Sequence, residues 1–354
     1  MNKLRLLTTS AFFVGGTLGA QAGGFELSPL STAFMYENGA YAEVSYSSRD
    51  YSITDGSVYA PTGSALKDQK NATFAFKSDL SDALSLGLTK YRQGSVQLDY
   101  SGAGSSLASA LPVVDMDIDA LVALARYELN ENFSVLAGLK QTTVQDSFGK
   151  NIFTNQTNIT GDSEVGHVYG LTYERDDIAL RVELTHEKAT NFKLESVNGS
   201  LSGKTTASVP DYLNFAFQTG VAKDTLLFGS IRKANWASNQ ITLFPQPSGT
   251  TSTYKDSTTY NIGLGRKIND QFSILASYKT EKAGDPNQAS LLNTTNGYDS
   301  LGVGVVYSLE NATITFGANY TKVGDVNMTP ATTPASVFSG NTVKSLGLKI
   351  GYNF

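Results

Sequence analysis

The sequence predicts an all-β fold, a transmembrane antiparallel β-barrel of about fourteen strands. Two patterns predict it: hydrophobicity alternates with period two in segments of about 9 to 14 residues, and the connections between these segments alternate between short and long. Period two is the signature of a strand, and a tilted strand of about ten residues crosses a bilayer. Because unpaired backbone groups are costly in hydrocarbon, such a sheet must close on itself.

The first 22 residues have the three parts of a secretory signal peptide. Lys3 and Arg5 precede an apolar run at 11–18, and Ala20-Gln21-Ala22 fits a cleavage site with small residues at its first and third positions. The run is too short to cross the roughly 30 Å of hydrocarbon in a bilayer. We therefore expect an exported protein whose mature chain begins at Gly23.

The stretch after the cleavage site, residues 23–40, is neither polar nor alternating. Its large apolar side chains include Phe25, Leu27, Leu30 and Phe34. Exposure of such side chains to water is unfavourable, and in the predicted fold the barrel lumen is the place where they can be buried. We therefore predict a short N-terminal hatch in the lumen, with these four side chains as ligand contacts. An extension of the first strand is the alternative.

The barrel itself is expected to span residues 41–354, after the signal peptide at 1–22 and the hatch at 23–40. The alternating segments predict strands at 41–53, 71–79, 84–93, 117–129, 132–146, 164–175, 178–190, 211–221, 225–237, 256–268, 271–282, 297–308, 311–323 and 342–354.

The connections predict how the barrel sits in the membrane. An even-stranded outer-membrane barrel has short periplasmic turns and long external loops. Six short joins, such as Asp176-Asp177, alternate with seven long ones rich in Gly, Ser, Thr, Asn and Pro. We expect external loops at 54–70, 94–116, 147–163, 191–210, 238–255, 283–296 and 324–341.

The alternation also assigns residues to the lipid or to the lumen. Between residues 178 and 187, Leu180 and Leu184 would face lipid, which turns Arg181 and Glu183 inward. The same rule places the cations Lys140, Arg181 and Lys279 in the lumen. A charge at the middle of the lipid face costs about 2 to 4 kcal/mol, so this facing is strongly favoured. The adjacent Arg232 and Lys233 fit neither face consistently.

Aromatic residues cluster near the predicted strand ends, as interfacial girdles require. β-propensity alone is the alternative explanation. The single tryptophan, Trp236, ends a predicted strand, and we interpret it as an interfacial anchor, with a ligand contact as the alternative.

Composition argues against several functional classes. A net charge of -5 and a pI near 5.2 argue against nucleic-acid binding. The two histidines, His167 and His186, form no metal-ligand cluster in the sequence, and no spacing supports a hydrolase built on His186. We predict that the protein is not an enzyme and needs no metal or cofactor.

One external loop contains an apolar stretch, SSLASALPVV at 105–114. Leu107 and Leu111 would lie on one face of a short amphipathic helix there. Apolar surface outside a membrane protein is a candidate binding site for an apolar ligand, although packing between loops explains it equally well.

Three segments resemble the FadL family of outer-membrane long-chain fatty-acid transporters. They are GGFELSPLSTAFMYENGAYAEVSYS, which follows the cleavage site, VPDYLNFAFQTGVAKDTLLFGSIRKANWAS at 209–238, and DSTTYNIGLGRKINDQFSILASYK at 256–279. The final GYNF is similar too. The chain departs from the family in lacking an Asn-Pro-Ala motif after the hatch, and its hatch and loops are short.

The resemblance implies a monomeric barrel that takes up hydrophobic compounds, most directly long-chain fatty acids, by passive diffusion. External loops would capture the ligand, and a lateral opening at a kinked strand would release it into the membrane. A carboxylate head group would then pair with Lys140, Arg181 or Lys279, although each could instead brace the barrel against a lumen glutamate. A general diffusion porin for small polar solutes, or a structural or receptor barrel, is the alternative.

The chain ends on KSLGLKIGYNF. Alternation turns its apolar residues toward lipid and makes it the last strand, closing against the first. The terminal Phe354 resembles the signal that hands barrels to their insertion machinery. We therefore expect a bacterial outer-membrane protein with three kinds of partner: hydrophobic small molecules, membrane lipids and the insertion machinery. The apolar residues are Leu346, Leu348, Ile350, Tyr352 and Phe354.

Overall fold

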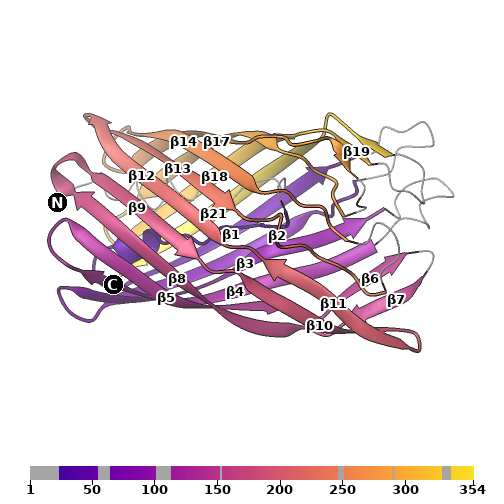
Figure 1. Cartoon of the computed structure of the whole chain (residues 1–354). Helices are drawn as coiled ribbons and strands as arrows, with labels where there is room; N and C mark the ends of the chain where they lie inside the picture. The colour runs from indigo at the N-terminus through magenta and orange to yellow at the C-terminus, as the bar shows by residue number, and fades with distance from the viewer. Residues whose placement is uncertain are drawn as a thin grey trace.

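The computed structural model describes residues 24–54, 64–100, 113–151, 154–245, 251–288, 290, 292–328 and 336–354. Within these residues the chain forms a closed antiparallel barrel with fourteen wall strands, as predicted (Figure 1). The wall strands are β1 (Tyr41–Ser52), β2 (Gln69–Asp79), β3 (Leu84–Asp99), β4 (Val113–Glu128), β5 (Phe133–Val144), β8 (Asp162–Arg175), β9 (Leu180–Glu187), β12 (Tyr212–Ala222), β13 (Thr225–Ala234), β14 (Ser257–Lys267), β15 (Phe272–Glu281), β17 (Tyr298–Ser308), β18 (Ala312–Val323) and β21 (Thr342–Asn353).

The first and last strands close the barrel. β1 and β21 pair without interruption from Tyr41↔Asn353 to Ser52↔Thr342, which confirms the predicted closure. The five apolar residues of the terminal strand lie on the outer surface, as expected, with exposed fractions from 41% for Ile350 to 75% for Phe354.

Alternation separates the two faces of the wall in the predicted way. In β9 the buried Arg181, Glu183 and Thr185 alternate with Val182 and Leu184 on the outer surface. The same pattern around the barrel gives an apolar outer belt, which matches the hydrocarbon of a bilayer. Among the described residues no helix is long and apolar enough to cross a membrane.

Aromatic side chains mark the periplasmic end of the belt. Tyr127, Phe133 and Tyr352 are exposed there, and ring pairs such as Phe133 with Tyr173 lie 4.9 Å apart between centroids. This placement at the strand ends is the one that interfacial girdles require.

Several segments expected as loops are strands instead. Two hairpins extend the sheet beyond the belt: β6 pairs with β4 and β7, and β7 pairs with β10 of the second hairpin. In β10, Phe192 is buried while Lys193 and Glu195 are exposed, so the alternation persists but the outer face is polar. The hairpin strands are β6 (Ser147–Asn151), β7 (Thr154–Ile159), β10 (Thr190–Asn198) and β11 (Leu201–Val209).

The remaining elements are short. A small external sheet contains β16 (Asn287–Gln288), β19 (Val326–Met328) and β20 (Ser336–Phe338). The 3-10 turns are η1 (Ala33–Tyr36) and η3 (Asp176–Ile178), and η3 forms one of the predicted short joins.

Candidate functional site

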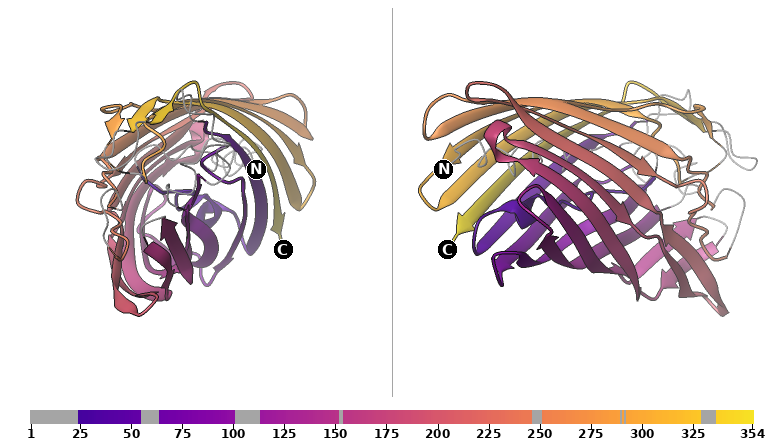
Figure 2. Two further views of the ribbon diagram at one scale, coloured as in Figure 1. Left: turned by 90° about the vertical axis from the view of Figure 1, so that its right-hand side faces the viewer. Right: turned by 60° about the vertical axis from the view of Figure 1, so that its left-hand side comes forward.

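The N-terminal segment, residues 24–40, lies inside the barrel. Figure 2, in its left-hand view along the barrel, shows the indigo chain enclosed by the wall. Phe25, Leu27 and Phe34 are at most 2% exposed, and Leu30 packs against the same apolar cluster as Phe34. All four side chains predicted as ligand contacts therefore lie in the interior, where they pack against protein.

The ladder between β2 and β3 stops part-way along the wall. It ends at the pair Phe74↔Lys90, although β2 continues along β1 to Gln69 and β3 continues along β4. Just beyond the end of the ladder, the pairing of β3 with β4 shifts register between Arg92 and Gly94. A bulge of this kind bends a strand away from its neighbour. We call this stretch the β2/β3 break.

The N-terminal segment lies on the inner side of the β2/β3 break. The Leu27 N–H donates to the Gln93 carbonyl at 2.8 Å, and the Ser95 N–H donates to the Phe25 carbonyl at 3.1 Å. The segment thus supplies backbone partners to β3 where β2 does not. A Cβ at Gly94 would stand 2.6 Å from the Phe25 ring, so glycine permits this close approach.

A buried charge network holds Glu26. Its carboxylate accepts hydrogen bonds of 3.1 and 2.6 Å from Arg232. Arg232 also donates to Glu187 at 3.0 Å, and Glu187 accepts from Lys140 at 2.9 Å. The negative charges of the two carboxylates balance the positive charges of Arg232 and Lys140. None of the four side chains is more than 19% exposed. Arg232, which the sequence left unassigned, therefore faces the lumen, while Lys233 is exposed.

Tyr36 is a second attachment of the segment. The guanidinium groups of Arg181 and Arg126 lie over its ring, 4.1 and 4.6 Å from the ring centre. Its hydroxyl donates to the Glu183 carboxylate, which also accepts from the Thr32 hydroxyl at 2.5 Å. Burial raises the pKa of Tyr36 well above its usual value, and the nearby Glu183 carboxylate adds to the effect. The hydroxyl therefore stays protonated and remains a donor.

Four aromatic rings pack together beside the first described residues of the N-terminal segment. Trp236 lies 4.8 Å from Phe25, 5.6 Å from Tyr254 and 6.2 Å from Tyr212, measured between ring centroids. The predicted interfacial position of Trp236 is wrong, because the side chain is 2% exposed and packs inside. Gly24 makes room for it, since a Cβ there would stand 2.4 Å from the indole.

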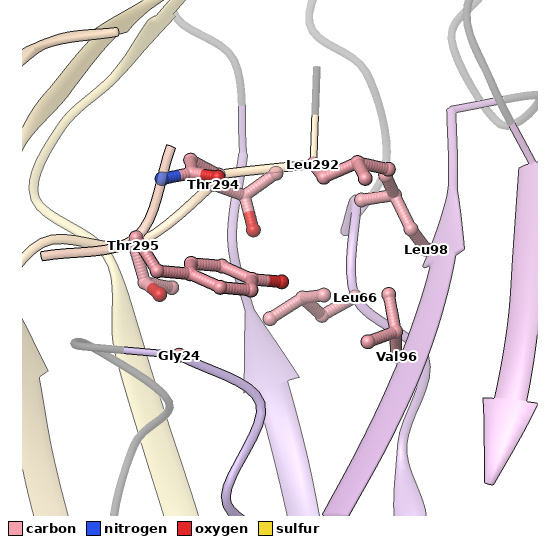
Figure 3. A pocket seen from close by; sticks show the side chains of 9 residues that line it. Gly24, Leu66, Val96, Leu98, Leu292, Thr294 and Thr295 are labelled. Carbon is pink, nitrogen blue, oxygen red and sulfur yellow. The ribbon is translucent and has the colours of Figure 1, made fainter. Parts of the chain in front are cut away.

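A cavity adjoins this aromatic group (Figure 3). Leu66, Val96 and Leu98 form one wall, and residues 292–295 with Tyr254 and Gly24 form the rest. Its volume is about 20 Å³, and a cavity of roughly 10 to 15 Å³ already holds one water molecule. A hydrocarbon would therefore need the segment or the 292–295 loop to move.

The three predicted lumen cations have different surroundings. Lys140 is fully buried and paired with Glu187, and Arg181 stacks on Tyr36. Lys279 lies 5.7 Å from the centre of the Tyr298 ring. In the described part of the chain Lys279 has no carboxylate oxygen within 4.0 Å, and its nearest acidic neighbours are Glu26 and Glu281.

The remaining candidates lie elsewhere. Leu107 and Leu111, the predicted external-loop contacts, fall outside the described residues. His186 is on the outer surface, with Nε2 3.5 Å from an Asp211 carboxylate oxygen. The described residues contain no group of three or more His, Cys, Asp or Glu arranged to hold a metal ion.

Comparison with solved structures shows the type of barrel. A FadL homologue of Pseudomonas aeruginosa superimposes with a TM-score of 0.76 at 13% identity, over 98% of each chain. The chain has the FadL fold. The toluene transporter TodX of P. putida gives a TM-score of 0.65 at 13% identity, over 91% of this chain and 92% of that chain. The toluene transporter TbuX of Ralstonia pickettii gives 0.62 at 14%, over 98% of each. No protein-family model and no curated protein matches the sequence.

The FadL fold and the apolar belt together place the protein in the bacterial outer membrane. Sequence reasoning missed Glu26 and Tyr254 as parts of the interior site. Glu26 offered a signal, because an acid in the middle of an apolar, sheltered segment needs a cationic partner. Tyr254 offered none, since it lies in a loop whose course the sequence does not determine.

Proposed function

We propose that this protein lets hydrophobic compounds diffuse across the outer membrane and releases them sideways through the β2/β3 break. The observation that carries the proposal is the interruption of the β2–β3 ladder, which the N-terminal segment covers from inside. The neighbours named as toluene transporters support a hydrophobic cargo. Diffusion of this kind needs only a concentration gradient.

The proposed route begins at the external loops, where Leu107 and Leu111 would offer an apolar landing surface. It continues to the aromatic group around Trp236, next to the cavity. Aromatic side chains provide large apolar contact areas for such cargo. From there the wall opening at β3 is adjacent, because Phe25 contacts both the Trp236 ring and the backbone of β3.

In this proposal the N-terminal segment is a hatch. Its first described residues form one side of the cavity and also cover the β2/β3 break. Moving residues 24–27 would therefore enlarge the cavity and uncover the break in one step. The attachments at Glu26 and Tyr36 hold the closed position.

More specifically, we propose that the cargo includes long-chain fatty acids. A carboxylate head group needs a cation without an internal acid partner, and Lys279 meets that condition better than Lys140. Lys279→Met should lower uptake of oleate about fivefold, a loss of roughly 1 kcal/mol, and leave uptake of toluene unchanged, because only the carboxylate of oleate would pair with the ammonium group. Equal uptake of oleate by both proteins would limit the cargo to neutral hydrocarbons.

A disulfide tests the hatch directly, because the natural chain has no cysteine. Asn71 of β2 donates to the Ser28 hydroxyl at 3.1 Å, so Ser28→Cys with Asn71→Cys would tie the segment to the wall. Cells with the oxidised pair should take up almost no toluene, and reduction should restore uptake. The control pair Ser300→Cys with Thr321→Cys joins two wall strands whose hydroxyls lie 2.8 Å apart.

Full uptake by the oxidised hatch pair would remove the hatch from the proposal. A general porin is distinguished by conductance, since a porin needs an open aqueous lumen. The proposal predicts very low ion conductance for the natural protein in planar bilayers. Large, stable conductance would favour the porin.

A further inference from the structure

One lysine interrupts the lipid-facing side of β3. Leu86 and Leu88 are exposed on the outer surface, and Lys90 follows them on the same face. Its direct neighbours across the sheet are Phe74 on β2 and Leu121 on β4, which are 46% and 39% exposed. Lys90 therefore lies among apolar residues that face hydrocarbon.

The depth of Lys90 makes this position costly. With a rise of about 3.3 Å per residue and a tilt of about 40°, Lys90 stands about 15 Å above Leu84, inside a belt about 25 Å tall. A charged residue at such a depth destabilises a barrel, and ionisable residues retained inside a membrane commonly have a functional role. Its flexible stem can bring the ammonium group toward the outer head-group region.

Within the described part of the barrel, no acid lies close enough to form an ion pair with this lysine. The neighbouring Arg92 is paired with Asp117 and, at 3.0 Å, with Asp119. Lys90, in contrast, has no carboxylate oxygen within 4.0 Å among the residues that the structure describes. The cation therefore faces the membrane without an ion-pair partner from the described residues.

Lys90 also occupies a special place in the wall. The pair Phe74↔Lys90 is the last of the β2–β3 ladder, so Lys90 forms the edge of the β2/β3 break. A compound that leaves through the break passes this side chain as it enters the lipid.

We propose that Lys90 binds an anionic head group at the edge of the β2/β3 break. The ligand chemistry is a carboxylate or phosphate oxygen, which a lysine ammonium group binds by charge-assisted hydrogen bonds. One source is the carboxylate of an amphipathic cargo as it leaves, and this form rests on the proposed function. The other source is a phosphate of a membrane lipid next to the break.

Uptake by cells that lack a native channel of this fold tests the first source, with oleate and toluene as probes. Lys90→Gln should lower oleate uptake about fivefold and leave toluene uptake unchanged, and Lys90→Arg should retain oleate uptake. Lys344→Gln is the matched control, because Lys344 is an exposed lysine on the outer face of β21, away from the break.

Native mass spectrometry of the purified proteins tests the second source. Loss of a bound phospholipid in Lys90→Gln, but not in Lys344→Gln, supports binding of a lipid phosphate. The inference is overturned if Lys90→Gln changes neither oleate uptake nor bound lipid, or if it lowers oleate and toluene uptake equally. If the natural protein takes up neither probe, the proposed function fails, and the bound-lipid measurement still decides the role of Lys90.

Discussion

Two seams of the barrel, the contacts of β1 with β21 and of β2 with β3, differ in how completely their strands pair. Where β21 meets β1, twelve consecutive residue pairs join the strands from end to end. Where β3 meets β2, six pairs join them before the ladder stops at Phe74↔Lys90. The first seam closes the wall against lipid, and at the second a separate segment replaces the missing strand partner. The difference shows that the ladder of a closed barrel can be interrupted if another part of the chain satisfies the exposed backbone.

The largest expected effect is at Glu26, which ties that separate segment to Arg232. Breaking a buried pair by removing one charge costs about 3 to 5 kcal/mol. Glu26→Gln should therefore release the segment, and ion conductance in planar bilayers should rise. Glu195→Gln is the control, since its partner Lys204 and Glu195 itself are more than half exposed. Conductance equal to that of the natural protein would show that other attachments hold the segment.

The continuous seam should respond through stability instead. Leu348 is exposed to lipid near the middle of β21, between Tyr46 and Phe316. Leu348→Arg should lower the free energy of unfolding by about 2 to 4 kcal/mol, measured by urea unfolding in lipid vesicles. Lys344→Arg, in the same strand, should change it by less than about 0.5 kcal/mol. Equal effects would contradict the depth assigned to Leu348.

A smaller effect is expected where the segment touches β3. A Cβ at Gly94 would stand 2.6 Å from the Phe25 ring and 2.9 Å from its carbonyl oxygen. Gly94→Ala should therefore displace Phe25 at a cost of about 1 to 3 kcal/mol and increase toluene uptake. Gly149→Ala is the control, because its nearest contact would be an ordinary 3.4 Å from Leu243. Unchanged uptake would mean that Phe25 does not limit passage.

The smallest effect concerns a single side-chain hydrogen bond between the segment and the wall. Asn71 donates to Ser28 from β2, and Asn71→Ala should weaken closure by about 0.5 to 1.5 kcal/mol. Faster proteolysis of the segment in the purified protein would register this change. Thr321→Val removes a comparable hydrogen bond to Ser300 within the wall and should leave proteolysis of the segment unchanged.

The sequence by itself determined the barrel. Period-two alternation in lipid allows one facing for each strand, so the fourteen strands, their orientation and the closure through β21 follow from local pattern. The same reasoning could place Phe25 and Phe34 in the barrel interior, because burial of large apolar side chains is favourable. It could also place Arg181 inward, because its neighbours in β9 face lipid.

Only the tertiary structure decided which residues meet inside. Arg232 reaches Glu26 across 206 positions of sequence, and Trp236 packs on Phe25, contacts that no periodicity encodes. The β2/β3 break depends on competition between β2 and the N-terminal segment for the backbone of β3, which is a matter of three-dimensional proximity. The external hairpins β6–β7 and β10–β11 depend on tertiary packing too, since beyond the bilayer no lipid face requires their outer residues to be apolar.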